Sequence, residues 1–234
     1  MFDEIKKCNK ECLVCVHAEN RYLVRRADRL KRESNPNATV EDYSDTHPAI
    51  AEEEAVIRMS YLAEKSRVPV YFVHMTSKEA IRRLEFIRSH NKFVNVETTS
   101  MYLSISRRDE NGRNEFKMDP PFRDAEDVEA LWNALDKGVI DTIGTHMTKK
   151  PAEMFGVYPQ KGTLLPGSDA DIVIVDMNKS VEVHASQLHS RSDFSVFEGR
   201  RLQGWPVTTI KGGQVLVDDG RLTGVKPSSK CLRR

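Results

Sequence analysis

Two histidines that directly follow short apolar runs carry the clearest chemical signal in the sequence. Apolar residues 13–16 lead into His17, and apolar residues 68–73 lead into His74. In a βα barrel the carboxyl ends of the strands meet at one face, where active sites form. Two imidazoles there could converge on a divalent metal such as zinc. Each could equally be a hydrogen-bonded residue at a strand end, and spacing alone leaves both interpretations open.

A hydrolytic zinc centre takes about three protein ligands plus water, so two histidines do not complete one. An acid at the end of the fourth predicted strand, residues 139–145, would be the natural addition. Asp141 stands near the beginning of that strand instead, which argues against it as a ligand. His146, just after the strand, could substitute or could be an ordinary loop residue.

Three cysteines near the start have the spacing C-x3-C-x2-C, which hints at a metal or cluster site. They are Cys8, Cys12 and Cys15, and the remaining cysteine, Cys231, lies far along the chain. Cys15 sits inside the apolar run 13–16, which predicts a buried strand in which a thiol behaves as a small hydrophobe. The spacing therefore favours structural, reduced cysteines over a metal cluster.

The elements that must position the histidines alternate between strands and helices up to about residue 150. Strands are predicted at 13–16, 68–73, 93–98 and 139–145, and helices at 20–33, 48–66, 77–89 and 125–137. This alternation is typical of parallel βαβ units. The helix at 48–66 has apolar residues spaced for one buried face, namely Ile50, Val56, Ile57, Tyr61 and Leu62.

After residue 160 the predicted elements are short strands without intervening helices, at 172–175, 205–211, 214–217 and 221–223. Asp219-Gly220 between the last two suits the positive φ angles of a tight hairpin turn. We therefore expect antiparallel β structure in this part of the chain.

Composition excludes several classes of protein. The 234 residues carry 36 Lys and Arg against 35 Asp and Glu, a net charge of +1, so no dominant basic field for nucleic acid is expected. No apolar run approaches the roughly 20 residues of a membrane span. The first residues, MFDEIKKCNK, lack an apolar signal core, so a cytoplasmic location is expected.

Several motifs together resemble one family, the cyclic-amide branch of the amidohydrolase superfamily. That branch contains dihydropyrimidinases and D-hydantoinases, allantoinases and dihydroorotases. The motifs are V-H-A-E-N at 16–20, H-P-A-I-A-E-E-E-A at 47–55, V-H-M-T-S-K-E-A at 73–80, V-E-T-T at 96–99, K-M-D-P-P-F-R at 117–123, P-A-E-M-F-G-V-Y-P-Q-K-G-T-L-L-P-G-S-D-A-D-I-V-I-V-D at 151–176 and H-S-R-S-D-F-S-V-F-E-G at 189–199. No single motif is specific, but their combination and order are.

The resemblance implies a metal-dependent hydrolase on a (β/α)8 TIM barrel, with one or two divalent ions, usually zinc, that activate water against a ring amide. It matches His17 and His74 to metal ligands after the fifth and sixth barrel strands, and Asp119 to a substrate-binding position. A carboxylate there disfavours an anionic ring such as dihydroorotate, relative to hydantoin or dihydropyrimidine. The expected partner is a small cyclic amide, with no nucleic acid and no membrane.

The chain also departs from the family pattern. It has no counterpart of the His-x-His pair after the first strand or of the lysine that becomes carboxylated. The aspartate of the eighth strand is missing, since Thr145 runs directly into His146. No catalytic residue can therefore be assigned from the resemblance.

A complete barrel takes roughly 250 residues. Residues 1–155 provide only about the last four strand–helix units, and residues 156–234 a small antiparallel β-sandwich part with the tail. Four strands cannot close a barrel and leave open edges, so a homo-oligomer or a complementing chain is expected. The alternatives are a hydrolase that is weak or inactive as this isolated chain, a non-catalytic scaffold or assembly subunit, and one half of a split enzyme.

Overall fold

The computed structural model of the protein describes residues 2–8, 12–109, 113, 116–144 and 149–226. The chain forms two compact units, Met1–His146 and Met147–Arg234, which are treated separately below. Among the described residues, no helix is both long and apolar enough to cross a membrane.

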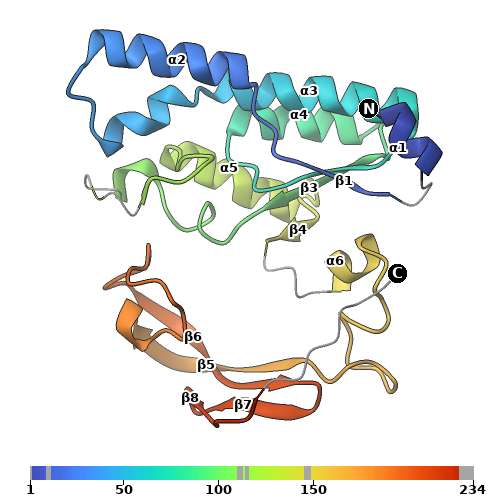
Figure 1. Ribbon diagram of the computed structural model, residues 1–234, viewed down its shortest axis with the longest axis vertical. Helices are drawn as coiled ribbons and strands as arrows, with labels where there is room; N and C mark the ends of the chain where they lie inside the picture. Colours follow the sequence, from blue (N-terminus) through green and yellow to red (C-terminus); the bar gives the residue numbers. More distant parts are fainter. Residues whose placement is uncertain (1, 9–11, 110–112, 114–115, 145–148, 227–234) are drawn as a thin grey trace. The chain divides into compact units, whose positions relative to one another are not determined.

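The first unit is built on a parallel sheet whose strand order follows the chain (Figure 1). Its strands are β1 (Val14–Val16), β2 (Val70–Phe72), β3 (Val94–Thr98) and β4 (Thr142–Ile143). The register places Val16 opposite Phe72 and Phe72 opposite Val96. The predicted parallel βαβ architecture is thus confirmed for this unit.

Helices connect these strands and cover the sheet. They are α1 (Phe2–Cys8), α2 (Arg21–Ser34), α3 (Ala49–Ser66), α4 (Lys78–Arg88) and α5 (Ala125–Asp136), with 3-10 turns η1 (Val40–Thr46) and η2 (Arg107–Asp109). Figure 1 shows α2, α3 and α4 on one side of the strands. Side chains cap two of them: Asn20 accepts from the Tyr22 amide at 3.0 Å, and Ser77 caps α4.

The core lies where alternate strand residues meet the helices. Val70, Phe72 and Val96 are fully buried, and so are Val56 of α3 and Leu84 of α4. These residues alternate along the strands with side chains of the opposite face, as the two-residue period of a strand requires. The strand ends are therefore held firmly.

Two burial predictions were wrong. Strand β1 is only half-buried, and Cys15 is exposed, because β1 stands at the edge of the four-stranded sheet. On α3, Val56 is buried as expected, but the four other apolar residues predicted for that face are exposed: Ile50, Ile57, Tyr61 and Leu62. Small residues form the inner face of α3 instead, among them Ala51, Ala55 and Ala63.

The second unit contains a four-stranded antiparallel sheet of order β5-β6-β7-β8. Its elements are α6 (Lys149–Met154), β5 (Ile172–Glu182), η4 (Ala185–Gln187), β6 (Arg201–Lys211), β7 (Gln214–Asp218) and β8 (Arg221–Leu222). Asp219 and Gly220 have φ angles of 42° and 74°, which confirms the predicted tight hairpin turn. The chain is therefore α/β overall, with one parallel and one antiparallel sheet.

Candidate metal and active site

The two strand-end histidines lie side by side in the first unit. His17 Nδ1 is 3.2 Å from His74 Nε2, and the ring centroids are 4.9 Å apart. His17 follows β1 directly, and His74 follows β2 after one further residue. His74 has a φ of 44°, an uncommon backbone conformation for a residue with a side chain. Such strain is tolerated where the surrounding structure holds it, and it often occurs at functional sites.

Glu19 lies on the far side of the His17 ring. Its Oε2 is 3.2 Å from His17 Nε2, and its side chain is only 4% exposed. This hydrogen bond raises the pKa of His17 against the opposing effect of burial. Burial would raise the pKa of Glu19, but His17, His47 and Arg123 outweigh it, so that pKa is lowered. Burial and the adjacent His17 lower the pKa of His74.

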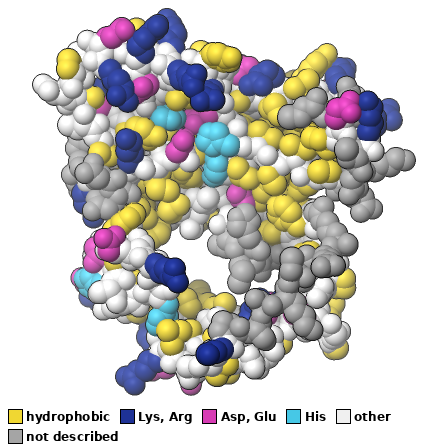
Figure 2. Space-filling view, in the orientation of Figure 1, with side chains coloured by type: hydrophobic (Ala, Val, Ile, Leu, Met, Phe, Trp, Pro, Cys, Tyr) yellow, Lys and Arg dark blue, Asp and Glu magenta, His cyan; other side chains and the backbone are white. Residues whose placement is uncertain are grey.

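A second polar layer surrounds Glu19. The Arg123 guanidinium approaches Glu19 Oε1 at 3.8 Å, and its Nη1 donates to the His47 carbonyl oxygen. His47 Nε2 in turn lies 3.6 Å from Asp119 Oδ1, with Asp119 largely exposed and His47 buried. Figure 2 shows histidine and acidic side chains adjoining one another on the surface of this unit. The layer leaves Asp119 at the mouth of the site.

Buried Glu52 of α3 fixes the loop that carries His74. Its Oε1 accepts from the Thr76 amide at 2.9 Å and the Thr76 hydroxyl at 3.1 Å, and its Oε2 accepts from the Ser77 amide at 2.6 Å. Arg123 also donates to the Thr76 hydroxyl, at 3.1 Å. One buried carboxylate thus orients the segment between β2 and α4.

Beneath the histidines, polar side chains link the three strands β2, β3 and β4. The Tyr71 hydroxyl donates to Glu97 Oε2 at 2.5 Å and lies 2.6 Å from the Thr142 hydroxyl. Glu97 Oε1 accepts from the His74 amide at 3.4 Å. A Cβ at Gly144 would come within 3.1 Å of the Glu97 carboxyl carbon, a tighter contact than most side chains make, so glycine leaves room for this carboxylate. These contacts place a buried carboxylate directly below His74.

The histidine pair fits two ligand positions of one metal ion. Two nitrogens bound to a tetrahedral zinc at about 2.0–2.1 Å lie about 3.3 Å apart, close to the 3.2 Å found here. A carboxylate that holds the outer nitrogen of a ligating histidine, as Glu19 does for His17, is the usual support of such a ligand. Ligand atoms of His17, Glu19 and Asp119 also lie within 4.8 Å of one another.

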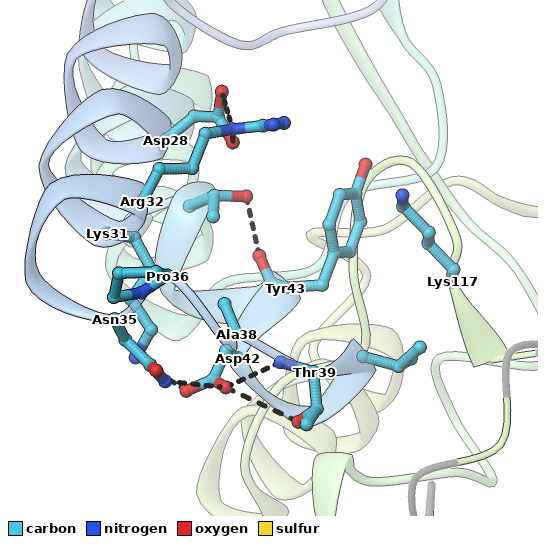
Figure 3. Close-up of a pocket in the computed structure, with 12 residues that line it drawn as sticks. Asp28, Lys31, Arg32, Asn35, Pro36, Ala38, Thr39, Asp42, Tyr43 and Lys117 are labelled. Carbon is cyan, nitrogen blue, oxygen red and sulfur yellow. Dashed lines mark hydrogen bonds and ion pairs between the residues drawn. The ribbon is translucent and has the colours of Figure 1, made fainter.

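A cavity of about 380 Å³ lies next to this site, between the end of α2 and η1 (Figure 3). Tyr43 forms one wall, and its ring also lies 4.7 Å from that of His47. Charged side chains that line the cavity pair with one another. Arg32 Nε donates to both carboxylate oxygens of Asp28 at 3.0 Å, and Lys31 Nζ lies 2.7 Å from Asp42 Oδ1. Burial raises the pKa of Tyr43 to about 12, so its hydroxyl stays protonated at neutral pH.

Comparison with known proteins agrees with the resemblance to the amidohydrolases. Residues 145–216 match the sequence model of the amidohydrolase family. The D-hydantoinase of Ralstonia pickettii is 28% identical and aligns with 95% of this chain and 60% of its own length. The L-hydantoinase of Paenarthrobacter aurescens is 27% identical over 95% of this chain and 59% of its own.

Solved structures give the same result. An L-hydantoinase (dihydropyrimidinase) from Arthrobacter aurescens is 26% identical and has a TM-score of 0.86 over 94% of this chain and 60% of its own. The D-hydantoinase of Bacillus sp. AR9 is 25% identical, with a TM-score of 0.88 over 95% of this chain and 61% of its own. The resemblance to the cyclic-amide branch of the amidohydrolases is thereby confirmed.

The chain spans about 60% of the length of the curated relatives it matches. The alignment with the Ralstonia protein covers 282 positions, more than the 234 residues of this chain. Residues of the relative must therefore fall between aligned residues of this chain. Both facts agree with a C-terminal portion that has an internal deletion.

The structure brings together His17, His74 and Asp119, which the sequence singled out, although their roles stay predictions. Asp141 is structural, since it accepts from Arg88 and from the Val96 amide at 2.8 Å. His146 lies outside the described residues, as do Cys231 and the side chain of Cys8. Cys12 is half-buried and Cys15 is exposed.

Sequence reasoning missed the roles of Glu19, His47, Glu52 and Arg123. In the sequence Glu52 is the first of three consecutive glutamates, yet it lies with Ala51 and Ala55 on the buried face of α3. Its position beside two alanines was the available signal. Nothing local in the sequence indicated that Arg123 would meet Glu19.

Proposed function

We propose that this chain is the C-terminal part of a metal-dependent hydrolase of cyclic amide bonds, acting on a hydantoin- or dihydropyrimidine-like ring. The observation that carries the proposal is the 3.2 Å separation of His17 Nδ1 and His74 Nε2 at the ends of neighbouring parallel strands. The similarity to hydantoinases over 95% of the chain supports the class of substrate.

In this proposal the four parallel strands are half of a (β/α)8 barrel, and the antiparallel sheet is part of a small β-sandwich. His17 and His74 contribute two ligands of a zinc ion, and further ligands come from a complementing chain or segment. A zinc site of the hydrolytic kind needs about three protein ligands, so the isolated chain is expected to be weak or inactive.

Each residue of the site then has a defined task. A bound zinc ion supplies a water of lowered pKa and polarises the ring carbonyl. Glu19 accepts a hydrogen bond from the N–H at His17 Nε2, so the lone pair of the other ring nitrogen, Nδ1, faces His74. Glu52 keeps the His74 loop in place. Asp119, exposed at the mouth, hydrogen-bonds ring N–H groups of a neutral substrate.

Cobalt(II) titration followed by visible absorption tests the metal site apart from turnover. The chain is expected to bind less than one equivalent, and His17→Ala and His74→Ala should each abolish that binding. His90→Ala is the matched control, because His90 is exposed at the end of α4. Unchanged binding in both site variants would refute the assignment of the ligands.

Hydantoin and dihydrouracil hydrolysis then tests the activity. The chain alone should show none above background. Co-expression with the part of the Ralstonia pickettii D-hydantoinase that this chain does not match should restore it, and His74→Ala should remove it again. Robust turnover by the chain alone would show that the site is complete without a partner.

A second candidate function is a non-catalytic assembly subunit. The observation favouring it is the row of large apolar side chains on the outer face of α3. A complemented complex that assembles, binds metal and still hydrolyses neither ring would favour this candidate.

A further inference from the structure

The outward face of α2 carries a concentration of arginine side chains. Five of the 14 residues of this helix are arginines, and all of them are exposed: Arg21, Arg25, Arg26, Arg29 and Arg32. Figure 2 shows Lys and Arg side chains gathered over this helix, along the upper edge of the view. No residue of α2 is buried, so this face of the helix is open to a partner.

The arginines in the second half of α2 have partners on the same helix. Arg32 Nε lies 3.0 Å from Asp28 Oδ1, and Arg29 Nε lies 3.9 Å from Glu33 Oε1. These pairs balance the charge of the C-terminal half of the helix.

The arginines in the first half of α2 are not balanced in this way. Within the part of the chain that the structure describes, Arg21, Arg25 and Arg26 have no ion-pair partner. They lie around Tyr22, which is 83% exposed. At 100° per residue the four side chains fall within an arc of about 140° and within two turns. We call these four residues the α2 arginine cluster.

The cluster departs from two rules of helix stability. The first turn of α2 has no acidic residue, although the helix dipole favours one there, and it begins with Arg21 instead. Arg25 lies one turn from both Arg21 and Arg29, where like charges repel. Helix α3 follows the dipole rule, with Glu52 in its first turn and Lys65 in its last. Such departures from local rules are expected at functional sites.

We propose that the α2 arginine cluster binds an acidic helical segment of a partner protein, with carboxylates one turn apart. Arg21 and Arg25 are separated by about 6 Å along the helix axis, the same rise as two glutamates four residues apart on a facing helix. A guanidinium can bind a carboxylate through two parallel hydrogen bonds, and arginine clusters are a recurring means of recognising acidic motifs. The exposed ring of Tyr22 offers an apolar contact between them.

The distribution of charge favours a short acidic segment over a larger anionic partner. Helix α2 has six basic and two acidic residues, a net charge of +4, whereas the whole chain has +1. The rest of the chain therefore carries a net charge of −3. A long nucleic acid or an anionic membrane would extend beyond α2 and meet that negative charge, but a short segment would not. The proposal is independent of the proposed hydrolase activity.

Fluorescence anisotropy of the full chain with a labelled peptide tests the proposal. The probe has fifteen residues, with glutamate at every fourth position and alanine elsewhere. At low salt the wild type should bind it with a dissociation constant below about 0.5 mM, and Arg21→Glu/Arg25→Glu should weaken binding about tenfold or more. Lys65→Glu/Arg221→Glu is the matched control, because it changes the net charge equally at exposed residues outside the cluster, and it should bind as the wild type does. Circular dichroism confirms that each variant is folded.

Charge reversal and other anions identify the kind of partner. The same peptide with lysine in place of glutamate should bind Arg21→Glu/Arg25→Glu more tightly than it binds the wild type. Absence of binding of the acidic peptide to the wild type, or equal binding by the wild type and Arg21→Glu/Arg25→Glu, overturns the proposal. Tighter binding of a single-stranded oligothymidylate, or of vesicles containing phosphatidylserine, than of the acidic peptide overturns it as well.

Discussion

Replacing Glu52 by alanine should destabilise the first unit more than any other single change at its acidic residues. Glu52 is buried, and its carboxylate accepts hydrogen bonds from the amides of Thr76 and Ser77 and from the Thr76 hydroxyl. Alanine leaves both amides buried without these acceptors. It also removes the carboxylate that faces the positive charge of Arg123.

The magnitude follows from these contacts. An unsatisfied buried donor costs about 1–3 kcal/mol, and Glu52→Ala leaves the two amides of Thr76 and Ser77 in that state. The contributions overlap, so Glu52→Ala should lower the free energy of unfolding by about 4 kcal/mol. Glu52→Gln keeps the shape and one acceptor oxygen, and should cost about 1–2 kcal/mol.

Urea denaturation monitored by tryptophan fluorescence measures this effect unit by unit. The chain has two tryptophans, Trp132 in α5 of the first unit and Trp205 in β6 of the second. In a Trp205→Phe background, Trp132 reports the first unit alone. The transition of that unit should move to lower urea in Glu52→Ala with its slope unchanged.

Glu53→Ala is the matched control, since Glu53 is the next residue of α3 and its ion pair among the described residues is with the exposed Arg83. It should cost no more than about 1 kcal/mol. A Glu52→Ala variant as stable as Glu53→Ala would refute the assignment of Glu52 as the residue that fixes the His74 loop.

Three further predictions concern the residues around the histidine pair. In proton NMR titrations, His17 should titrate above pH 6.5 and His74 below it, and Glu19→Gln should lower the His17 midpoint. Since the pKa of His17 is raised, the stability it contributes is present below pH 6.5 and is lost as the pH rises through the raised pKa; it should be under about 1 kcal/mol, because the His17 side chain is 44% exposed. The free energy of unfolding of His74→Gly should exceed that of His74→Ala by about 1 kcal/mol, with a higher urea midpoint, because a φ of 44° favours glycine. Equal stabilities would contradict that backbone conformation. Tyr71→Phe should cost about 2 kcal/mol in the same urea assay through its lost hydrogen bond to Glu97, and a neutral effect would show that this bond contributes nothing.

Much of the first unit could be predicted because its elements have strong local signals. Four strand–helix repeats follow from apolar runs and helix caps, such as Ser77 before α4. The hairpin at Asp219-Gly220 follows from turn chemistry alone. Helix α1 and helix α6 went unpredicted, because each is short and has no sustained apolar period.

The inner face of α3 could not be predicted from hydrophobicity. Periodicity selects the largest apolar side chains, and here those are Ile50, Ile57 and Tyr61. The helix instead packs through Ala51, Ala55 and Ala63, since small residues allow close approach to α4 and β2. A rule that places the largest apolar side chains of a helix in the core therefore selects the wrong face of α3.

The contact between His17 and His74 does not follow from the two strand ends alone; it also requires the backbone conformation at His74. The register puts Val16 opposite Phe72, so continued strands would place His17 opposite Val73 and turn His74 to the other face of the sheet. The chain leaves the strand conformation after Phe72, and the positive φ of His74 returns its ring toward His17. Glu52 and Glu97 hold the backbone in that conformation from two sides. The pairing that strand-end spacing suggests is therefore achieved by a local distortion, one that buried carboxylates stabilise.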